Sequence, residues 1–206
     1  MRLRGLYAIT PGQGPQCPPL AERVRLAIAG GARLIQYRDK SDDTDRRRRE
    51  VGELLAVCRA GGVPLIVNDD VALALEAGAD GVHLGREDAD PAAARRQLGA
   101  AAIIGVSCYD QLERAREARA AGADYVAFGR FFPSATKPRA VPANPELLRQ
   151  ARRELALPLV AIGGITPDNA PALLAAGADL LAVIHGVFGQ GEVRAAAAAY
   201  SRLFPA

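Results

Sequence analysis

The feature that most constrains the fold of this chain is a repeated unit of helix, glycine turn and strand. The stretches "AGGARLIQYR", "AGADGVHLG", "AGADYVAFG" and "AGADLLAVI" begin at Ala29, Ala77, Ala121 and Ala176. Each follows an Ala/Leu/Arg-rich segment typical of a helix, supplies glycine as a helix stop and then enters a short apolar strand. Such units alternate helices with buried, parallel strands.

Four further strands fit between the repeated units. They are "LYAIT" at 6–10, "PLIVN" at 64–68, "AIIGVS" at 102–107 and "LPLVAIGG" at 157–164. Eight strands, each followed by a helical segment and without a shift in composition, predict an α/β fold. We expect a closed (β/α)8 TIM barrel that forms one domain over residues 1–206. A doubly wound open sheet is the alternative, because one missed or false strand would undo the closure.

The composition narrows the class of protein. No window approaches the roughly 18 consecutive apolar residues of a membrane helix, and "MRLRGLYAIT" is too short for a signal peptide. We therefore expect a cytoplasmic protein without a membrane partner. The cysteines Cys17, Cys58 and Cys108 are far apart and lack a Cys-x-x-Cys pair, which favours reduced thiols over a disulfide or zinc site.

The basic run "DRRRRE" at 45–50 raises the question of a nucleic-acid partner. The run opens a helical segment that ends near Ala60, acids flank it, and no aromatic residues are interleaved with it. The net charge is only +3. We therefore interpret the run as a solvated helix face and expect no nucleic-acid partner.

In a (β/α)8 barrel the chemistry lies where the strands end. Polar stretches follow the predicted strands, among them "QYRDK", "NDD", "GRED", "SCYD", "RFFPSATK" and "HGVFG". Alternation along the second strand sets Gln36, Arg38 and Lys40 on the face turned away from the helices. The two cations suit phosphate oxygens. Salt bridges to nearby acids are the alternative.

Acidic residues follow the third and fourth strands. Asp69 and Asp88 lie at the ends of neighbouring strands, so their carboxylates can converge. Two hard oxygen ligands without a nearby His or Cys cluster suit Mg²⁺, which keeps several waters and binds substrate phosphates. Helix capping is the alternative for an Asp at a helix start. We expect Asp70 to cap the next helix, Asp69 to reach a metal and Asn68 to reach a ligand.

A second anion site is predicted among the loops after the last three strands. The stretch "PSATK" at 133–137 supplies two hydroxyls and an ammonium group, with an exposed loop as the alternative. Gly163, Gly164 and His185 follow strands seven and eight, where barrels commonly hold phosphate on backbone N–H groups. Two anion sites and a metal imply two phosphorylated reactants, or one reactant with two phosphate groups.

Six of these motifs together carry a resemblance to a known family. The motifs "QYRDK", "VNDD", "HLGRED", "GVS", "PSATK" and "AIGGI" fall in the order and spacing of thiamine phosphate synthase, which the chain resembles essentially end to end. The resemblance implies a Mg²⁺-dependent transferase that joins hydroxymethylpyrimidine diphosphate to thiazole phosphate and releases pyrophosphate. It also implies a dissociative reaction, in which a pyrimidine carbocation forms before the thiazole nitrogen captures it.

The resemblance assigns a role to each motif. The residues implied to hold the pyrimidine diphosphate are Gln36, Arg38, Lys40, Asn68, Ser107 and Lys137. Of these, Arg38, Ser107 and Lys137 are the implied catalytic residues. The implied metal ligands are Asp69 and Asp88. The residues implied to line the thiazole phosphate site are Ser134, Thr136, Gly164, Ile184 and His185. Ser134 and His185 depart from the family, where Thr and Ser are more usual.

Two relatives with other activities are the alternatives. A thiazole tautomerase uses a His in the loop after strand five, where this chain has Tyr109, and lacks the acids and cations found here. A non-catalytic paralogue that binds phosphorylated ligands would have lost an acid or the lysine of "PSATK", and none is lost. The sequence does not indicate an oligomeric state.

The chain has two histidines, His83 and His185. His83 alternates inward on the fourth strand, which favours a hydrogen-bonded core histidine over a direct ligand. The protonated imidazole of His185 is predicted to add a charge-assisted hydrogen bond to phosphate as pH falls. In the alternative, the ring turns outward and only the backbone contacts phosphate.

Overall fold

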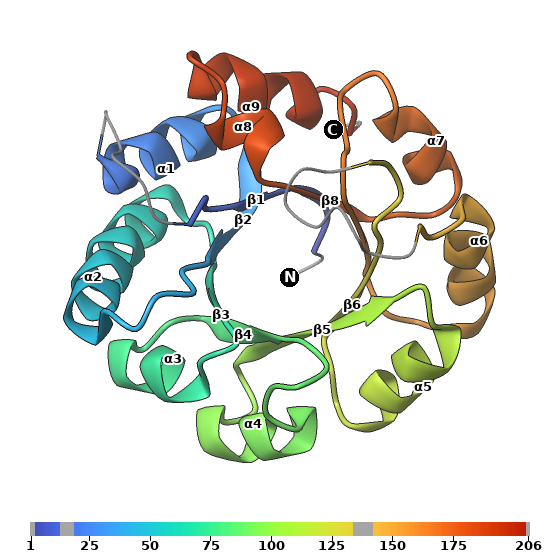
Figure 1. Ribbon diagram of the computed structural model, residues 1–206, viewed down its shortest axis with the longest axis horizontal. Coiled ribbons are helices and arrows are strands. Elements are labelled where there is room, and N and C mark those ends of the chain that lie inside the picture. Colours follow the sequence, from blue (N-terminus) through green and yellow to red (C-terminus); the bar gives the residue numbers. More distant parts are fainter. Residues whose placement is uncertain (1–2, 13–18, 134–141, 205–206) are drawn as a thin grey trace.

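The computed structural model describes residues 3–12, 19–133 and 142–204. Eight parallel strands pair in chain order and close into a barrel, and helices surround it (Figure 1). The first strand pairs with the last, for example through Leu6 and Leu181. The predicted (β/α)8 barrel is confirmed, and this pairing rules out the open sheet.

All eight predicted strands are present. They are β1 (Gly5–Ile9), β2 (Ala32–Tyr37), β3 (Leu65–Asn68), β4 (Gly81–Leu84), β5 (Ile103–Tyr109), β6 (Tyr125–Phe128), β7 (Leu159–Ile162) and β8 (Leu180–Val183). Most of their residues are buried. Strands of a parallel barrel are covered on both faces, which explains the short apolar runs of the sequence.

The helices follow the strands as the repeat predicts. They are α1 (Leu20–Ala29), α2 (Thr44–Gly61), α3 (Val71–Ala77), α4 (Pro91–Leu98), α5 (Leu112–Ala120), α6 (Pro145–Glu154), α7 (Ala170–Ala175), α8 (His185–Phe188) and α9 (Val193–Ser201). Gly62 and Gly78 end α2 and α3 in the left-handed conformation that glycine adopts without strain. Within the described segments, no helix is both long and apolar enough to cross a membrane.

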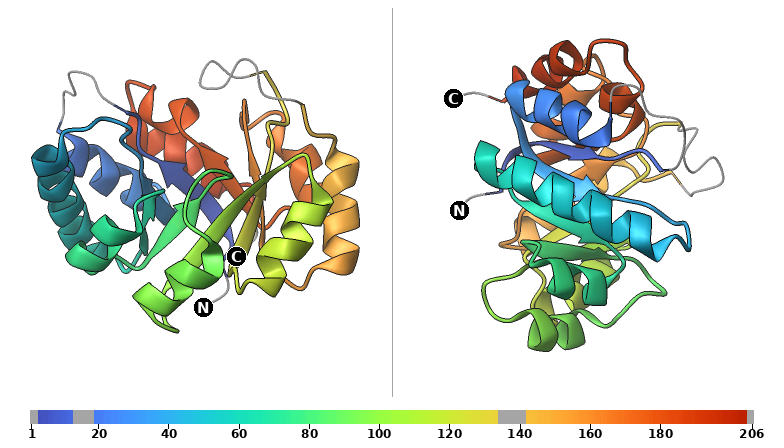
Figure 2. Two further views of the ribbon diagram at one scale, coloured as in Figure 1. Left: turned by 60° about the horizontal axis from the view of Figure 1, so that its bottom comes forward. Right: turned by 90° about the vertical axis from the view of Figure 1, so that its left-hand side faces the viewer.

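Two layers of apolar side chains hold the barrel together. The outer layer lies between the strands and the helices and includes Ile35 and Tyr37. The inner layer lies inside the barrel and includes Tyr7, Leu34 and Val160. Figure 2 shows the helices packed around the barrel from two further sides. The alternation along β2 is therefore as predicted, with Ile35 and Tyr37 turned toward the helices.

Two of the three cysteines fall within the described residues. Cys58 and Cys108 are buried free thiols, as predicted. Burial raises the pKa of each to about 12, so both stay protonated at neutral pH. Cys17 lies outside the described residues.

Candidate active site

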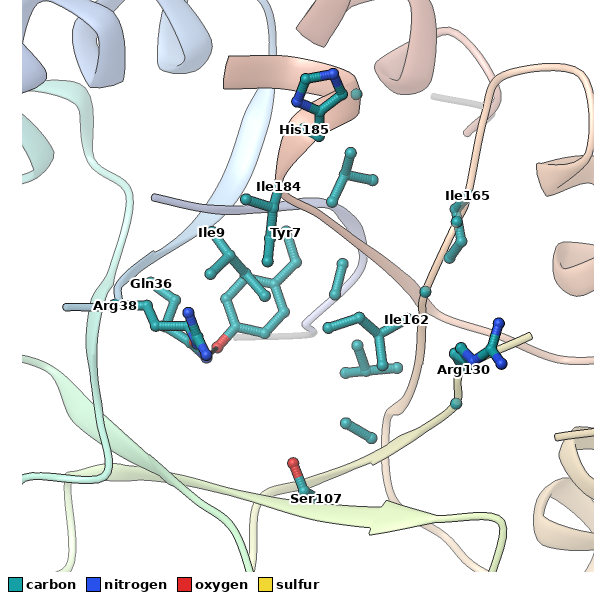
Figure 3. A pocket seen from close by; sticks show the side chains of 18 of the residues that line it. Tyr7, Ile9, Gln36, Arg38, Ser107, Arg130, Ile162, Ile165, Ile184 and His185 are labelled. Carbon is teal, nitrogen blue, oxygen red and sulfur yellow. Dashed lines mark hydrogen bonds between the residues drawn. The ribbon is translucent and has the colours of Figure 1, made fainter. Parts of the chain in front are cut away.

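A cavity of about 420 Å³ lies inside the barrel and is lined by residues from all eight strands and the loops that follow several of them (Figure 3). Its lining includes the predicted site residues Gln36, Arg38, Asn68, Ser107, Gly164, Ile184 and His185. The predicted residues Ser134, Thr136 and Lys137 lie outside the described residues. Tyr109, which stands where the tautomerase would have His, also lines the cavity.

The remaining predicted residues form a charged cluster in the loops after β2, β3 and β4. The carboxyl groups of Asp69 and Asp88 lie within hydrogen-bonding reach of each other. Lys40 Nζ lies 3.1 Å from Asp69 Oδ2, and the Gly85 N–H donates to Asp88 Oδ2 at 2.5 Å. Burial, together with the adjacent Asp69 carboxylate, raises the pKa of Asp88 above its usual range. Two carboxylates this close repel each other, so the pair is stabilised when a proton or a cation lies between them.

Lys40 takes part in the salt bridge that the sequence left as an alternative. Its side chain is 62% exposed, and Lys40 does not line the cavity. Arg38 differs, because it lines the cavity. Among the described residues, no carboxylate lies within salt-bridge distance of Arg38. The Arg38 guanidinium is therefore available to an anionic ligand in the cavity.

The three polar residues at the end of β3 have separate roles. Asn68 is the last residue of the strand and lines the cavity. Asp69 has a positive φ of 64°, which turns the chain sharply between strand and helix. Asp70 caps α3, because its side chain accepts a hydrogen bond from Leu73 N at 2.8 Å. The predicted cap is confirmed, and the turn at Asp69 lets its carboxylate reach Asp88.

The basic run at the start of α2 is only partly a solvated face. Arg46 Nη2 lies 2.5 Å from Asp39 Oδ2, and Arg47 Nη2 lies 2.8 Å from Asp70 Oδ2. For these two arginines the prediction of a solvated face is wrong, because their side chains reach back to the loops after β2 and β3. Arg48 remains half exposed. We call Arg46 and Arg47 the α2 tethers, since they hold the two loops that carry the charged cluster.

The loops after β6 and β7 are held together by backbone contacts. Gly163 and Gly164 have positive φ values of 103° and 62°. A Cβ added to Gly164 would lie 2.3 Å from the Pro133 carbonyl oxygen, and Phe132 N donates to Gly163 O at 3.0 Å. Only glycine permits this close approach. Arg130, in the same loop, lines the cavity and was missed by the sequence analysis.

His185 lies at the edge of the cavity next to Ile184 (Figure 3). It is exposed and begins the short helix α8. A Cβ added to Gly189 would lie 2.1 Å from His185 Nδ1, so the imidazole ring lies against the backbone at the end of α8. This packing favours the alternative in which only the backbone at His185, and not its ring, contacts phosphate.

A line of hydrogen-bonded side chains crosses the inside of the barrel, and we call it the floor chain. Its members are Gln36, Tyr7, Tyr125, His83 and Ser107. Gln36 Nε2 lies 2.6 Å from Tyr7 Oη, and the two tyrosine hydroxyls lie 2.7 Å apart. His83 Nδ1 lies 3.0 Å from Tyr125 Oη, and His83 Nε2 lies 2.9 Å from Ser107 Oγ. His83 is thus the hydrogen-bonded interior histidine that the sequence favoured, although it also lines the cavity.

A parallel eight-stranded barrel with polar side chains gathered at the carboxyl ends of its strands belongs to the class of (β/α)8-barrel enzymes, whose active sites lie at that end. Residues 6–187 match the family described as thiamine monophosphate synthase. The chain belongs to the thiamine monophosphate synthase family and is a transferase.

Curated relatives and a solved structure agree with this assignment. A thiamine-phosphate synthase of Azoarcus sp. is 57% identical over 203 residues, which cover 98% of each chain. One of Nitrosococcus oceani is 55% identical over 203 residues, covering 98% of this chain and 94% of the relative. The structure of thiamine phosphate pyrophosphorylase from Pyrococcus furiosus is 38% identical, with a TM-score of 0.86, and covers 98% of this chain and 96% of that chain.

Proposed function

We propose that this protein joins hydroxymethylpyrimidine diphosphate to thiazole phosphate and releases pyrophosphate, which forms thiamine phosphate. The observation that carries the proposal is the cluster of Lys40, Asp69 and Asp88 beside a cavity that Arg38 lines. Paired acids and cations suit a diphosphate and its counter-ion. The names of the relatives support the same activity.

The charged cluster fits Mg²⁺. Asp69 and Asp88 offer hard oxygen ligands, and their mutual repulsion favours a cation between them. Among the described residues, no group of three or more His, Cys, Asp or Glu side chains is placed to hold a metal, so water and substrate phosphates would supply the other ligands. When bound, Mg²⁺ would neutralise charge on the diphosphate.

The side chains that line the cavity suit a dissociative reaction. As the carbon–oxygen bond to the diphosphate breaks, negative charge grows on the leaving group, and Arg38 faces the cavity to meet it. The Ser107 hydroxyl would donate to the pyrimidine substrate. Lys40 would exchange its contact with Asp69 for a phosphate oxygen. A catalytic role of Lys137 stays a prediction, because this residue lies outside the described part of the chain.

The opposite loops would hold the thiazole phosphate. Gly164, Ile184 and His185 line the cavity and can offer backbone N–H groups to a phosphate. Ser134 and Thr136 would complete this site. In this arrangement the thiazole nitrogen would meet the pyrimidine carbocation inside the cavity. A cytoplasmic location also stays a prediction.

The test is to incubate the purified protein with both precursors, with and without Mg²⁺, and to measure thiamine phosphate and pyrophosphate. We expect both products in equal amounts, and only with the metal. Product formation that survives a chelator would refute the metal site. Binding of both precursors without any product would support a non-catalytic paralogue. Isomerisation of a thiazole phosphate incubated alone would support the tautomerase.

A further inference from the structure

The floor chain joins Gln36 to Ser107 through Tyr7, Tyr125 and His83, and of its five members only Tyr125 does not line the cavity. Tyr7 is 1% exposed and Tyr125 is fully buried, so an unpaired hydroxyl hydrogen on either residue would be costly. The Tyr125 ring also stacks on the imidazole of His83, with a centroid distance of 5.6 Å and an interplanar angle of 18°. Figure 3 shows the Tyr7 hydroxyl beside Gln36, with the Ser107 hydroxyl across the cavity. The chain therefore connects opposite walls of the site.

The direction of the hydrogen bonds follows from the chemistry of Gln36. Its Nε2 carries only hydrogens, so Tyr7 Oη accepts at this contact. If Tyr125 also donated to Tyr7, the hydrogen of the Tyr7 hydroxyl would be buried without an acceptor, which is costly. The Tyr7 hydroxyl therefore donates to Tyr125.

The direction continues to the far end of the chain. Because the Tyr125 oxygen accepts from Tyr7, its own hydrogen goes to His83 Nδ1. The neutral imidazole then carries its hydrogen on Nε2 and donates it to Ser107 Oγ. The hydrogen of the Ser107 hydroxyl remains for a ligand. At the other end, Gln36 keeps its Oε1 and one amide hydrogen for a ligand.

We propose that Tyr7, Tyr125 and His83 are positioning residues that fix the donor and acceptor pattern offered by Gln36 and Ser107. The proposal rests on the proposed function, in which these two residues hold the pyrimidine. A Gln amide pairs with an amino group and the adjacent ring nitrogen, as it does with adenine. The site therefore selects an aminopyrimidine over an oxopyrimidine, which presents an acceptor where the amino group presents a donor.

The selectivity comes from the coupling of the five side chains. To bind the oxopyrimidine, the Gln36 amide must rotate by half a turn, so that its Oε1 instead of its Nε2 contacts Tyr7 Oη. Every hydrogen in the chain must then reverse, and the histidine must move its hydrogen from Nε2 to Nδ1. One mismatched buried hydrogen bond weakens binding by roughly tenfold to a hundredfold. Through this coupling, Tyr7, Tyr125 and His83 contribute to that penalty.

The first test measures the tautomer of His83 in the protein without ligands. The chain has only two histidines, so isotopically labelled histidine gives two imidazole signals in NMR, and His185→Ser assigns them. We expect His83 to be neutral with its hydrogen on Nε2, and Tyr125→Phe to raise the fraction with hydrogen on Nδ1. Hydrogen on Nδ1 in the unchanged protein would overturn the proposal. This measurement does not depend on the enzyme being active, and the only variant that the assignment needs is a change at the exposed His185.

The second test compares the binding of the aminopyrimidine diphosphate and its oxo analogue by calorimetry. We expect the ratio of the two dissociation constants to fall about tenfold in Tyr7→Phe and in Tyr125→Phe. Tyr200→Phe is the matched control, because it removes another buried phenol hydroxyl, which donates to Ile165 O at 2.9 Å outside the floor chain. We expect Tyr200→Phe to keep the ratio of dissociation constants that the unchanged protein shows.

Equal losses of selectivity in all three variants would overturn the proposal, since general loosening of the barrel would then explain them. An unchanged ratio in Tyr7→Phe and Tyr125→Phe would do the same. If the protein binds the two pyrimidines with the expected ratio but forms no thiamine phosphate, the proposed function fails and the role of the floor chain stands. Calorimetry therefore separates the two failures.

Discussion

The two halves of the barrel mouth hold their functional groups by different physical means. In the half formed by β2, β3 and β4, charged side chains cluster, and the α2 tethers hold the loops that carry them. In the half formed by β6, β7 and β8, the backbone of two loops is pressed together through Gly163 and Gly164. We call these the charged half and the glycine half.

The difference teaches that each half is vulnerable to a different kind of substitution. Charges in the first half act over several ångströms, so the loss of one charge changes affinity even when the shape is kept. The second half depends on the absence of side-chain atoms, so one added methyl group moves the backbone. Four predictions test this contrast, beginning with the largest expected effect.

Removing one of the two acids should impair catalysis and metal binding in the charged half. We expect Asp69→Asn and Asp88→Asn each to lower the rate of thiamine phosphate formation by about 100-fold or more, because a charge that balances the metal is lost. A titration with Mg²⁺ should show weaker apparent affinity in both. Asp70→Asn is the control, since Asn keeps the helix cap and makes the same charge change one residue away, although it also weakens the contact with Arg47, so only a small loss is expected. An equal loss in this control would contradict the assignment.

Adding a methyl group at Gly164 should impair the binding of thiazole phosphate in the glycine half. We expect Gly164→Ala to raise the KM for thiazole phosphate about tenfold, because the new Cβ forces the loop away from Pro133. The KM for the pyrimidine diphosphate should change little. Gly62→Ala is the control, because its φ of 63° is nearly that of Gly164 while a Cβ there meets nothing within 4 Å. It should cost about 1 kcal/mol of stability without changing either KM.

Cutting an α2 tether should loosen the charged half without removing any of its charges. Arg46→Gln leaves the Asp39 side chain, which is 4% exposed, without its partner at 2.5 Å. We expect the free energy of unfolding to fall by about 1–3 kcal/mol at neutral pH and the KM for the diphosphate to rise about threefold. Arg49→Gln, on the exposed part of the same helix, is the control. Similar losses in both would show that the tether does not matter.

The stability cost of Arg46→Gln should depend on pH. Although burial opposes it, Ser41 and Arg46 together hold the pKa of Asp39 below its usual range. A carboxyl with a lowered pKa in the folded protein stabilises it above the unfolded pKa of about 3.9, and this stability is lost as pH falls through the folded value. Urea unfolding should therefore show the full difference at about pH 7 and a shrinking difference as the pH falls through the folded pKa of Asp39.

The smallest effect is expected for His185. Because its ring lies on the backbone of Gly189, we expect His185→Ser to change the dissociation constant of thiazole phosphate less than about twofold between about pH 6 and pH 8. Titrating both proteins with the same ligand cancels the ionisation of the phosphate itself. Tighter binding at low pH in the parent alone would instead assign the contact to the imidazole.

The barrel could be predicted from the sequence because its signals are local. Glycine follows most of the helices, short apolar strands recur along the chain, and Gly62 and Gly78 adopt the left-handed conformation that such stops require. The cap at Asp70 is local too. The convergence of Asp69 and Asp88 was predictable once the order of the strands was known, since neighbouring parallel strands end at the same edge.

The contacts that the sequence analysis missed depend on register and on side-chain reach. Tyr7 and Tyr125 meet from β1 and β6, which are not neighbours in the sheet, and no local pattern indicates which inward residues touch across a barrel. The turn of Arg46 and Arg47 toward the loops depends on long side chains that helix periodicity does not place. Such residues can be found only once the barrel is built.

The left-handed backbone at Asp69 also restricts how this position can evolve. Glycine, asparagine and aspartate adopt that conformation most readily, and aspartate alone among them carries a carboxylate. Replacement by a β-branched residue would strain the turn and damage the fold. Replacement by asparagine or glycine would keep the fold and erase the charge. A single substitution at Asp69 can therefore remove the carboxylate and leave a stable barrel. Such a barrel could evolve to bind other ligands.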